Sequence, residues 1–172
     1  QAQAAPISLA GATVTATYNN DVNGISGADS GYTPGTGANV THVTDSITDA
    51  EFITNDGLYI VDFSTTGLLT VYADNVQAAG QHTLRFDFGN TLSPALASFT
   101  ALDTSAITGA PLFSLLNSHA FALDLSNVSF SGPFVSFTAQ LGAAVPEPAS
   151  FALLVAGLAG IGASRRKRAT TP

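Results

Sequence analysis

The sequence predicts an all-β fold: an antiparallel β-sandwich, followed by one apolar helix near the C-terminus. Three observations support this class. Apolar and polar residues alternate with a period of two at many places before residue 142. Glycine, proline and short polar residues separate these stretches, and the period of an amphipathic helix is scarce among them. Strands with one apolar face pack as two sheets, in a jelly-roll or immunoglobulin-like arrangement, and a closed barrel is the alternative.

Six stretches carry the alternation most clearly, and they cover residues 13–18, 58–63, 68–72, 82–88, 121–125 and 135–141. In the fourth, Leu84, Phe86 and Phe88 share one face, which predicts a strand with that face in the core. Gly67 and the polar residues before it separate the second stretch from the third, and so predict a hairpin. We expect roughly 7 to 10 strands in all.

Three regions lack this alternation. We expect a turn or two of helix at residues 95–101 and again at 112–117, although neither range has a convincing cap. The range 19–39 holds five glycines, one proline and few large apolar residues. That composition predicts a long surface loop, and loops of this kind are mobile or functional.

Charge is distributed unevenly along the 172 residues. Residues 1–144 carry eleven acidic side chains and a single base, Arg85, whereas the other four bases lie at 165–168. One arginine cannot neutralise a phosphate backbone, so the composition excludes nucleic-acid binding. The chain has no cysteine and therefore neither disulfides nor a thiolate nucleophile. Residues 6–142 are long enough for one β-sandwich domain with its own core.

Acidic residues in the predicted loop suggest a calcium site. Asp21, Asn23 and Asp29 in the predicted loop are oxygen ligands of the kind that Ca²⁺ prefers. Their spacing differs from that of an EF-hand loop, and a loop that uses Asp, Asn and Gly for its turns has the same composition. Ca²⁺ is the single candidate cofactor. A second cluster, made of Asp45, Asp49 and Glu51, is interpreted as solvated surface.

Catalytic patterns are missing from the sequence. The histidines His42, His82 and His119 show no metal-ligand spacing, no G-x-S-x-G is present, and each histidine is interpreted as an exposed strand or turn residue. We therefore predict that the chain is not an enzyme. Tyr32, in the glycine-rich range, is the candidate for an exposed aromatic ring that could stack on a sugar, whereas the other tyrosines are assigned to packing.

The C-terminal segment combines three unlike parts. Residues 145–150 read Val-Pro-Glu-Pro-Ala-Ser, an apolar run follows, and Arg165, Arg166, Lys167 and Arg168 end it. A helix over residues 149–164 would span about 24 Å, less than the ~30 Å hydrocarbon core, and the basic side chains can reach the head groups. Positive residues favour the cytoplasmic side. We expect a linker at 143–150, a transmembrane sorting helix at 151–164 and a basic cytoplasmic tail at 165–172.

This order of parts closely resembles the PEP-CTERM sorting domain of Gram-negative bacteria. The resemblance implies that exosortase recognises Pro146, Glu147 and Pro148, and that cleavage near the motif removes the helix and the basic tail. The two prolines also keep the segment extended, which is the form that a protease-like site binds. The resemblance therefore implies two partners, exosortase and, transiently, the inner membrane.

The start of the chain agrees with export. Ala2-Gln3-Ala4 fits the small residues that precede a signal-peptidase cut, so residues 1–5 are expected to be a signal-peptide remnant and flexible start. By the resemblance, the protein crosses the inner membrane and reaches the cell surface or the extracellular space.

We expect a structural or adhesive protein of an exopolysaccharide or biofilm matrix, whose partners are exopolysaccharide or copies of itself. In one form of this hypothesis, the strand at 14–18 is donated to a neighbouring copy. The alternative is a carbohydrate- or calcium-binding module with its site at 21–32.

Overall fold

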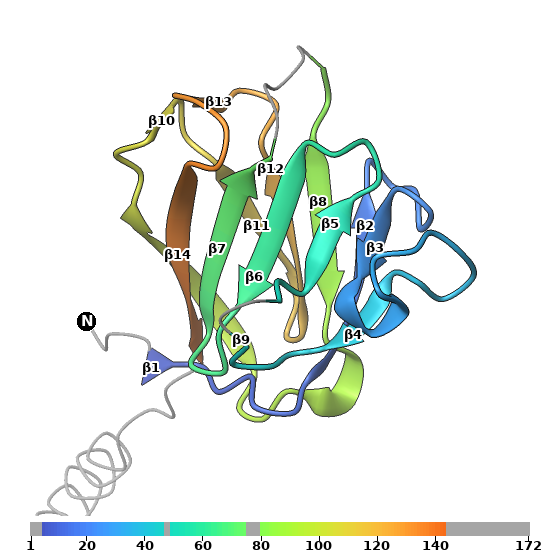
Figure 1. The fold of residues 1–172 in the computed structure, drawn as a ribbon. Helices are drawn as coiled ribbons and strands as arrows, with labels where there is room; N and C mark the ends of the chain where they lie inside the picture. The colour runs from blue at the N-terminus through green and yellow to red at the C-terminus, as the bar shows by residue number, and fades with distance from the viewer. Residues whose placement is uncertain (1–4, 47–48, 75–79, 144–172) are drawn as a thin grey trace, which may run out of the picture.

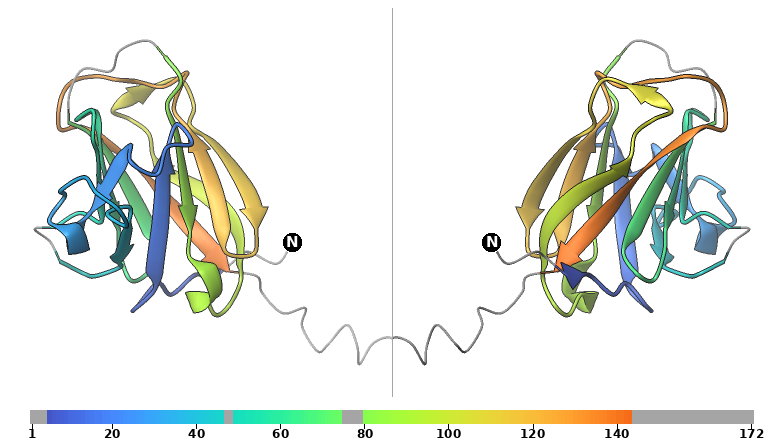
Figure 2. Two further views of the ribbon diagram at one scale, coloured as in Figure 1. Left: turned by 90° about the vertical axis from the view of Figure 1, so that its right-hand side faces the viewer. Right: turned by 90° about the vertical axis from the view of Figure 1, so that its left-hand side faces the viewer.

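The computed structural model describes residues 5–46, 49–74 and 80–143, which form two antiparallel sheets packed face to face (Figures 1 and 2). The all-β, antiparallel class predicted from the alternation is confirmed. The predicted C-terminal helix, the linker motif and the basic tail lie outside the described residues. No helix in the described part of the chain is long and apolar enough to cross a membrane.

The larger sheet has seven strands, in the order β1 (Ala5–Pro6), β14 (Ser136–Ala143), β7 (Leu68–Ala73), β6 (Tyr59–Phe63), β5 (Phe52–Thr54) and β3 (Ile25–Gly27), with β9 (Leu96–Asp103) also paired to β14. The smaller sheet has five, in the order β11 (Leu112–Asn117), β12 (Ala120–Asp124), β8 (Thr83–Asp87), β2 (Thr13–Tyr18) and β4 (Val40–His42).

The remaining elements are short. The strands β10 (Ile107–Thr108) and β13 (Ser129–Phe130) pair with each other, and two 3₁₀ turns, η1 (Ala28–Ser30) and η2 (Gly89–Thr91), lie in connections. The described residues thus hold fourteen strands, more than the roughly 7 to 10 expected. The difference arises because strands of two or three residues are too short to show an alternation.

Alternating side chains fill the space between the sheets, as the sequence pattern predicted. Leu84, Phe86 and Phe88 are almost wholly buried. The ring of Phe86 packs against those of Phe63 and Phe121, with centroids 5.1 Å away in both cases. Burying a phenylalanine side chain stabilises a fold by about 1.5–3 kcal/mol. The predicted hairpin is also confirmed, because β6 and β7 pair and the turn between them contains Gly67 with φ of 79°.

The helical expectation at residues 95–101 and 112–117 is wrong. The first range belongs to β9, which pairs with β14, and the second is β11, which pairs with β12. Both strands lie at the edge of a sheet and are largely exposed, so their sequences show no apolar alternation. Leu and Ala have high helix propensity, but propensity is a weak determinant in a folded protein and sheet pairing outweighs it here.

The range 19–39 is more ordered than the loop that its glycines predicted. It contains β3 and η1, and Ile25 and Ser26 are fully buried. A Cβ on Gly27 would lie 2.9 Å from the Cβ of Thr41, so this glycine permits β3 to approach β4 closely. Strand β2 is paired within the single chain to both β8 and β4, and donation of residues 14–18 to a neighbouring copy stays a prediction.

The two sides of the sandwich are built differently. On the β3–β4 side, formed by β3, β4 and the residues 28–39 between them, the connection is tied down by backbone bonds: Gly27 N–H donates to Ala38 at 2.6 Å and Ala28 N–H donates to Glu51 at 3.0 Å. On the β9–β11 side, formed by these two strands, each strand is paired along one edge only among the described residues. The right-hand view of Figure 2 faces this second side.

Candidate functional site

The predicted calcium ligands have other roles in the structure. The Asp21 carboxylate accepts a 2.8 Å hydrogen bond from the N–H of Asn23 and so closes a turn. The Asp29 carboxylate lies 2.6 Å from the Nδ1 of His42 on β4. Within the described residues, no group of three His, Asp or Glu side chains is placed to hold a metal ion. The structure thus gives the calcium hypothesis no geometric support.

Tyr32 holds the chain together locally and is not an open stacking platform. Its side chain is half-buried, and its hydroxyl donates a 2.5 Å hydrogen bond to the carbonyl of Ala50. Burial raises the pKa of this hydroxyl, with a further contribution from Asp49. The bond fixes the 28–39 connection to the segment that precedes β5.

The histidines occupy three environments. His42 is exposed, as predicted, but His82 is only 5 % exposed, so that prediction of an exposed residue was wrong. Its Nδ1 lies 2.7 Å from the hydroxyl of Tyr18, and its ring stacks on the Tyr18 ring. His82 is buried because it directly precedes β8 and lies over the aromatic end of the core. That the chain is not an enzyme stays a prediction.

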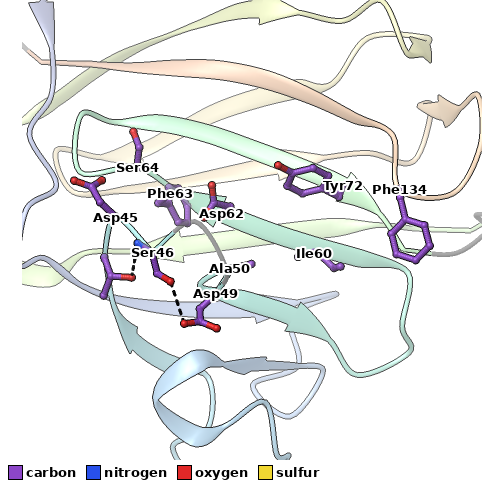
Figure 3. A pocket seen from close by; sticks show the side chains of 11 residues that line it. Asp45, Ser46, Asp49, Ala50, Ile60, Asp62, Phe63, Ser64, Tyr72 and Phe134 are labelled. Carbon is purple, nitrogen blue, oxygen red and sulfur yellow. Dashed lines mark hydrogen bonds between the residues drawn. The ribbon is translucent and has the colours of Figure 1, made fainter.

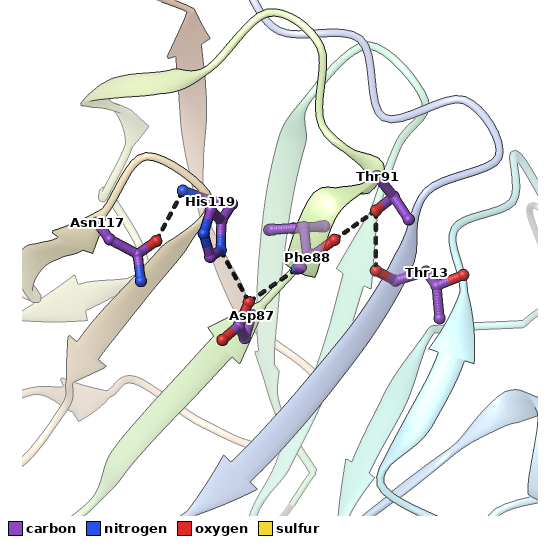
Figure 4. Close-up of polar contacts among 7 residues, drawn as sticks. Thr13, Asp87, Phe88, Thr91, Asn117 and His119 are labelled. Atoms are coloured by element: carbon purple, nitrogen blue, oxygen red, sulfur yellow. Dashed lines mark hydrogen bonds and ion pairs between the residues drawn. The ribbon is translucent and has the colours of Figure 1, made fainter.

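His119 fixes the β11–β12 hairpin to the neighbouring strand β8 (Figure 4). Its Nδ1 lies 3.1 Å from the Asp87 carboxylate, which also accepts the N–H of Gly89 at 2.8 Å. Partial burial opposes ionisation of Asp87, but these hydrogen bonds outweigh it and lower the pKa. The side chain of Asn117 accepts the N–H of His119 at 2.8 Å and completes the turn. The hairpin that carries the edge strand β11 is therefore held in place.

The β9–β11 side exposes large apolar side chains. Leu112, Leu115 and Leu116 on β11 are 55 %, 45 % and 43 % exposed, and Leu102 on β9 is 58 % exposed. On the same two strands, the Phe99 ring stacks on the Phe113 ring with centroids 5.2 Å apart and joins the two sheets. Strand β11 carries no charged residue and no proline. An apolar sheet edge of this kind is a candidate surface for pairing with another strand.

Glu51 is a buried acid that the sequence did not reveal. It was interpreted as solvated surface, yet its side chain is only 1 % exposed. Its two carboxyl oxygens accept the N–H groups of Thr44 at 3.0 Å and Phe63 at 2.6 Å. Burial raises its pKa to about 7, although the two hydrogen bonds oppose the rise. Burial likewise raises the pKa of the neighbouring Asp62, against the effect of a hydrogen bond with Glu51.

The structure and the tail together define a β-sheet body followed by a C-terminal sorting signal. Comparison with protein families identifies that signal: the model of the PEP-CTERM protein-sorting motif matches residues 144–167. The chain therefore carries this motif, as the resemblance indicated, and the motif implies export, membrane-associated sorting in Gram-negative bacteria and exosortase as the processing partner. Comparison with curated proteins and with solved structures gives no match.

The sorting motif and the described body meet at one point. The matched range begins at residue 144, directly after the last residue of β14. The predicted recognition residues Pro146, Glu147 and Pro148 and the predicted membrane stop, Arg165 to Arg168, lie outside the described residues. Their roles stay predictions of the resemblance, whereas the motif begins in the sequence directly after β14.

Proposed function

We propose that this exosortase-sorted protein has a structural or adhesive role at the cell surface or in the extracellular matrix, and that copies join through β11. The observation that carries the proposal is an uncharged edge strand with three exposed leucines. Association with exopolysaccharide or a biofilm, which the resemblance implies, stays a prediction.

Edge strands are usually protected against pairing. Common protections are lysine, proline, short length and a bulge within the strand. Strand β11 has six residues and no charge, and its irregularity lies at one end, between Leu115 and Asn117. Its free backbone groups would be satisfied by an antiparallel strand from a second molecule.

A second copy fits this edge better than an unrelated strand. An antiparallel pair of identical strands satisfies a two-fold axis, so one surface serves both partners. Residues 1–144 carry eleven acids and one base, so copies repel each other over most of their surface. Strand β11 lacks acidic side chains, so electrostatic repulsion opposes the approach of a second copy least at this strand.

Cysteine cross-linking tests the proposal cleanly, because the chain has no cysteine of its own. Ser114→Cys places a thiol on the exposed part of β11, and Thr36→Cys places one on the exposed β3–β4 side as the matched control. We expect the full chain with Ser114→Cys to form a reductant-sensitive dimer under mild oxidation, and Leu115→Lys in that background to abolish it. Equal dimer yields from the two cysteine variants would contradict the proposal.

Sorting is tested separately by the mass of the protein recovered from the cells. The resemblance predicts a C-terminus close to Pro148 in the parent chain. Glu147→Ala, which removes the acid between the two prolines, should leave the basic residues Arg165 to Arg168 in place. Identical processing of the parent chain and the variant would show that exosortase does not recognise Glu147.

A further inference from the structure

A hollow of about 710 Å³ lies on the outer face of the larger sheet, over β6 and β7 (Figure 3). Its volume falls within the range of about 300–1,000 Å³ that small-ligand sites occupy. Among the described residues that line it, none belongs to β9 or β11. One end of the hollow is aromatic and the other is lined by carboxylates and hydroxyls.

The aromatic end is built by two strands and one turn. Tyr72 on β7 and Ile60 on β6 are direct cross-strand partners, and Phe134 stands beside Tyr72 from the turn before β14 (Figure 3). Phe134 is 70 % exposed, the most exposed large apolar side chain in the described part of the chain. The two rings form one apolar wall.

Phe134 is held in an unfavourable conformation. Its φ is 57°, in the left-handed region that costs residues with a side chain roughly 1–2 kcal/mol. Its N–H donates to the carbonyl of Ala73 at 2.6 Å, and the N–H of Ala73 donates to the carbonyl of Val135 at 3.0 Å. Folding stability alone would favour Gly or Asn at this position, because both tolerate a positive φ and neither exposes a large apolar side chain to water. The backbone bonds hold the turn in place, and residues in strained backbone conformations cluster at ligand-binding and active sites.

The opposite end presents fixed acceptors. The Asp45 carboxylate accepts the N–H and the hydroxyl of Thr65, and Asp49 accepts the hydroxyl of Ser46 at 3.0 Å. Asp62 lies half-buried between these residues and the aromatic wall. No basic side chain lines the hollow in the part of the chain that the structure describes. Carboxylates accept strong hydrogen bonds from hydroxyl groups, and they repel anions.

We propose that this hollow binds neutral sugar units of a polysaccharide. A pyranose ring has an apolar C–H face that can pack on Tyr72 and Phe134, and hydroxyl groups that can donate to Asp62 and Asp49. The combination of an apolar wall with a few fixed polar groups matches that chemistry. Phosphorylated ligands and uronic acids are disfavoured, because their negative charge would face three carboxylates.

The test is binding of the full chain, kept in a detergent without sugar groups, to an array of neutral, amino and uronic-acid oligosaccharides, followed by calorimetric titration of the best neutral ligand. We expect neutral oligosaccharides to bind and uronic acids not to bind. Tyr72→Ala and Phe134→Asn should each weaken binding by roughly tenfold or more. Asn tolerates the left-handed conformation, so Phe134→Asn removes the ring without lowering the thermal midpoint.

Two further variants serve as controls. Leu102→Asn removes another largely exposed apolar side chain, from β9, and should leave binding unchanged. Asp62→Asn keeps the size of the side chain, removes the charge and should weaken binding. Three outcomes would each overturn the proposal: no neutral oligosaccharide binds at millimolar concentration, only amino sugars bind, or Phe134→Asn binds as tightly as the parent chain.

Discussion

The two sides of the sandwich differ in how their edge strands meet the solvent. On the β3–β4 side, Ile25 and Ser26 of the short strand β3 are wholly buried, and the 28–39 connection is bonded to the sheet through Gly27 and Ala28 and exposes no large apolar side chain. On the β9–β11 side, longer strands keep a free edge and expose leucines. The β3–β4 side shows that this sequence can protect the edge of a sheet. The exposed edge on the β9–β11 side is therefore a feature of its own sequence and not a necessity of the fold.

The largest expected difference between the sides concerns apolar truncation. Ile25→Ala removes a wholly buried side chain from β3 and should lower the free energy of unfolding by about 2–5 kcal/mol. Leu102→Ala on β9 should change it by less than about 0.5 kcal/mol, because that side chain is 58 % exposed. Chemical denaturation of both variants measures the difference. Equal losses would show that the β9–β11 side is buried in solution.

The second prediction concerns pH. Glu51, whose main chain accepts the N–H of Ala28 on the β3–β4 side, has a pKa of about 7 in the folded protein, compared with 4.5 ordinarily. Between these values the native state binds more protons than the unfolded state, so the free energy of unfolding falls as pH rises. The fall reaches at most about 3 kcal/mol and ends above pH 7.

Denaturation midpoints between pH 5 and 8 test this dependence. Asp45, Asp87, Asp103 and Asp124 have lowered pKa values and act in the opposite direction, but only as pH falls through about 4. Glu51→Gln should flatten the slope between pH 5 and 7, at the cost of one backbone hydrogen bond. An unchanged slope in this variant would assign the effect to another group, with Asp62 next to be tested.

A smaller loss of stability is expected from a substitution at the point where the backbones of β3 and β4 approach each other. Gly27→Ala puts a Cβ 2.9 Å from that of Thr41, and the resulting displacement should cost about 1–3 kcal/mol. Gly132→Ala is the matched control, because a Cβ there meets nothing within 4 Å and φ is not positive. Thermal unfolding of the two variants gives the comparison, and equal midpoints would mean that β3 can move away from β4 freely.

The sequence alone predicts the strands that have one face toward the core and the other toward water. Leu84, Phe86 and Phe88 alternate with polar residues because one face is dry and the other wet. It was insufficient for β9 and β11, since these edge strands bury only a few side chains and expose apolar residues as well as polar ones, which leaves no clear alternation. Short strands such as β3 escape prediction because their glycines resemble those of a loop. In the structure, these glycines allow close packing.

The site residues were harder to predict for a different reason. Glu51 stands among surface acids in the sequence, and its burial follows from N–H groups contributed by Thr44 and Phe63, which tertiary structure alone brings together. Likewise, the hollow combines Tyr72, Asp49 and Phe134, each from a different segment. One signal was available: a large aromatic side chain directly after the turn residues Gly132 and Pro133.

Strand β14 determines how a mechanical load would enter the protein. It pairs with β7 and β1 along one edge and with β9 along the other, and the sorting motif begins directly after it. A load applied to the chain beyond residue 143 would therefore reach β14 first, where hydrogen bonds along both edges oppose its removal. In a body held from this end, both sets of bonds would have to break before the strand could leave the sheet.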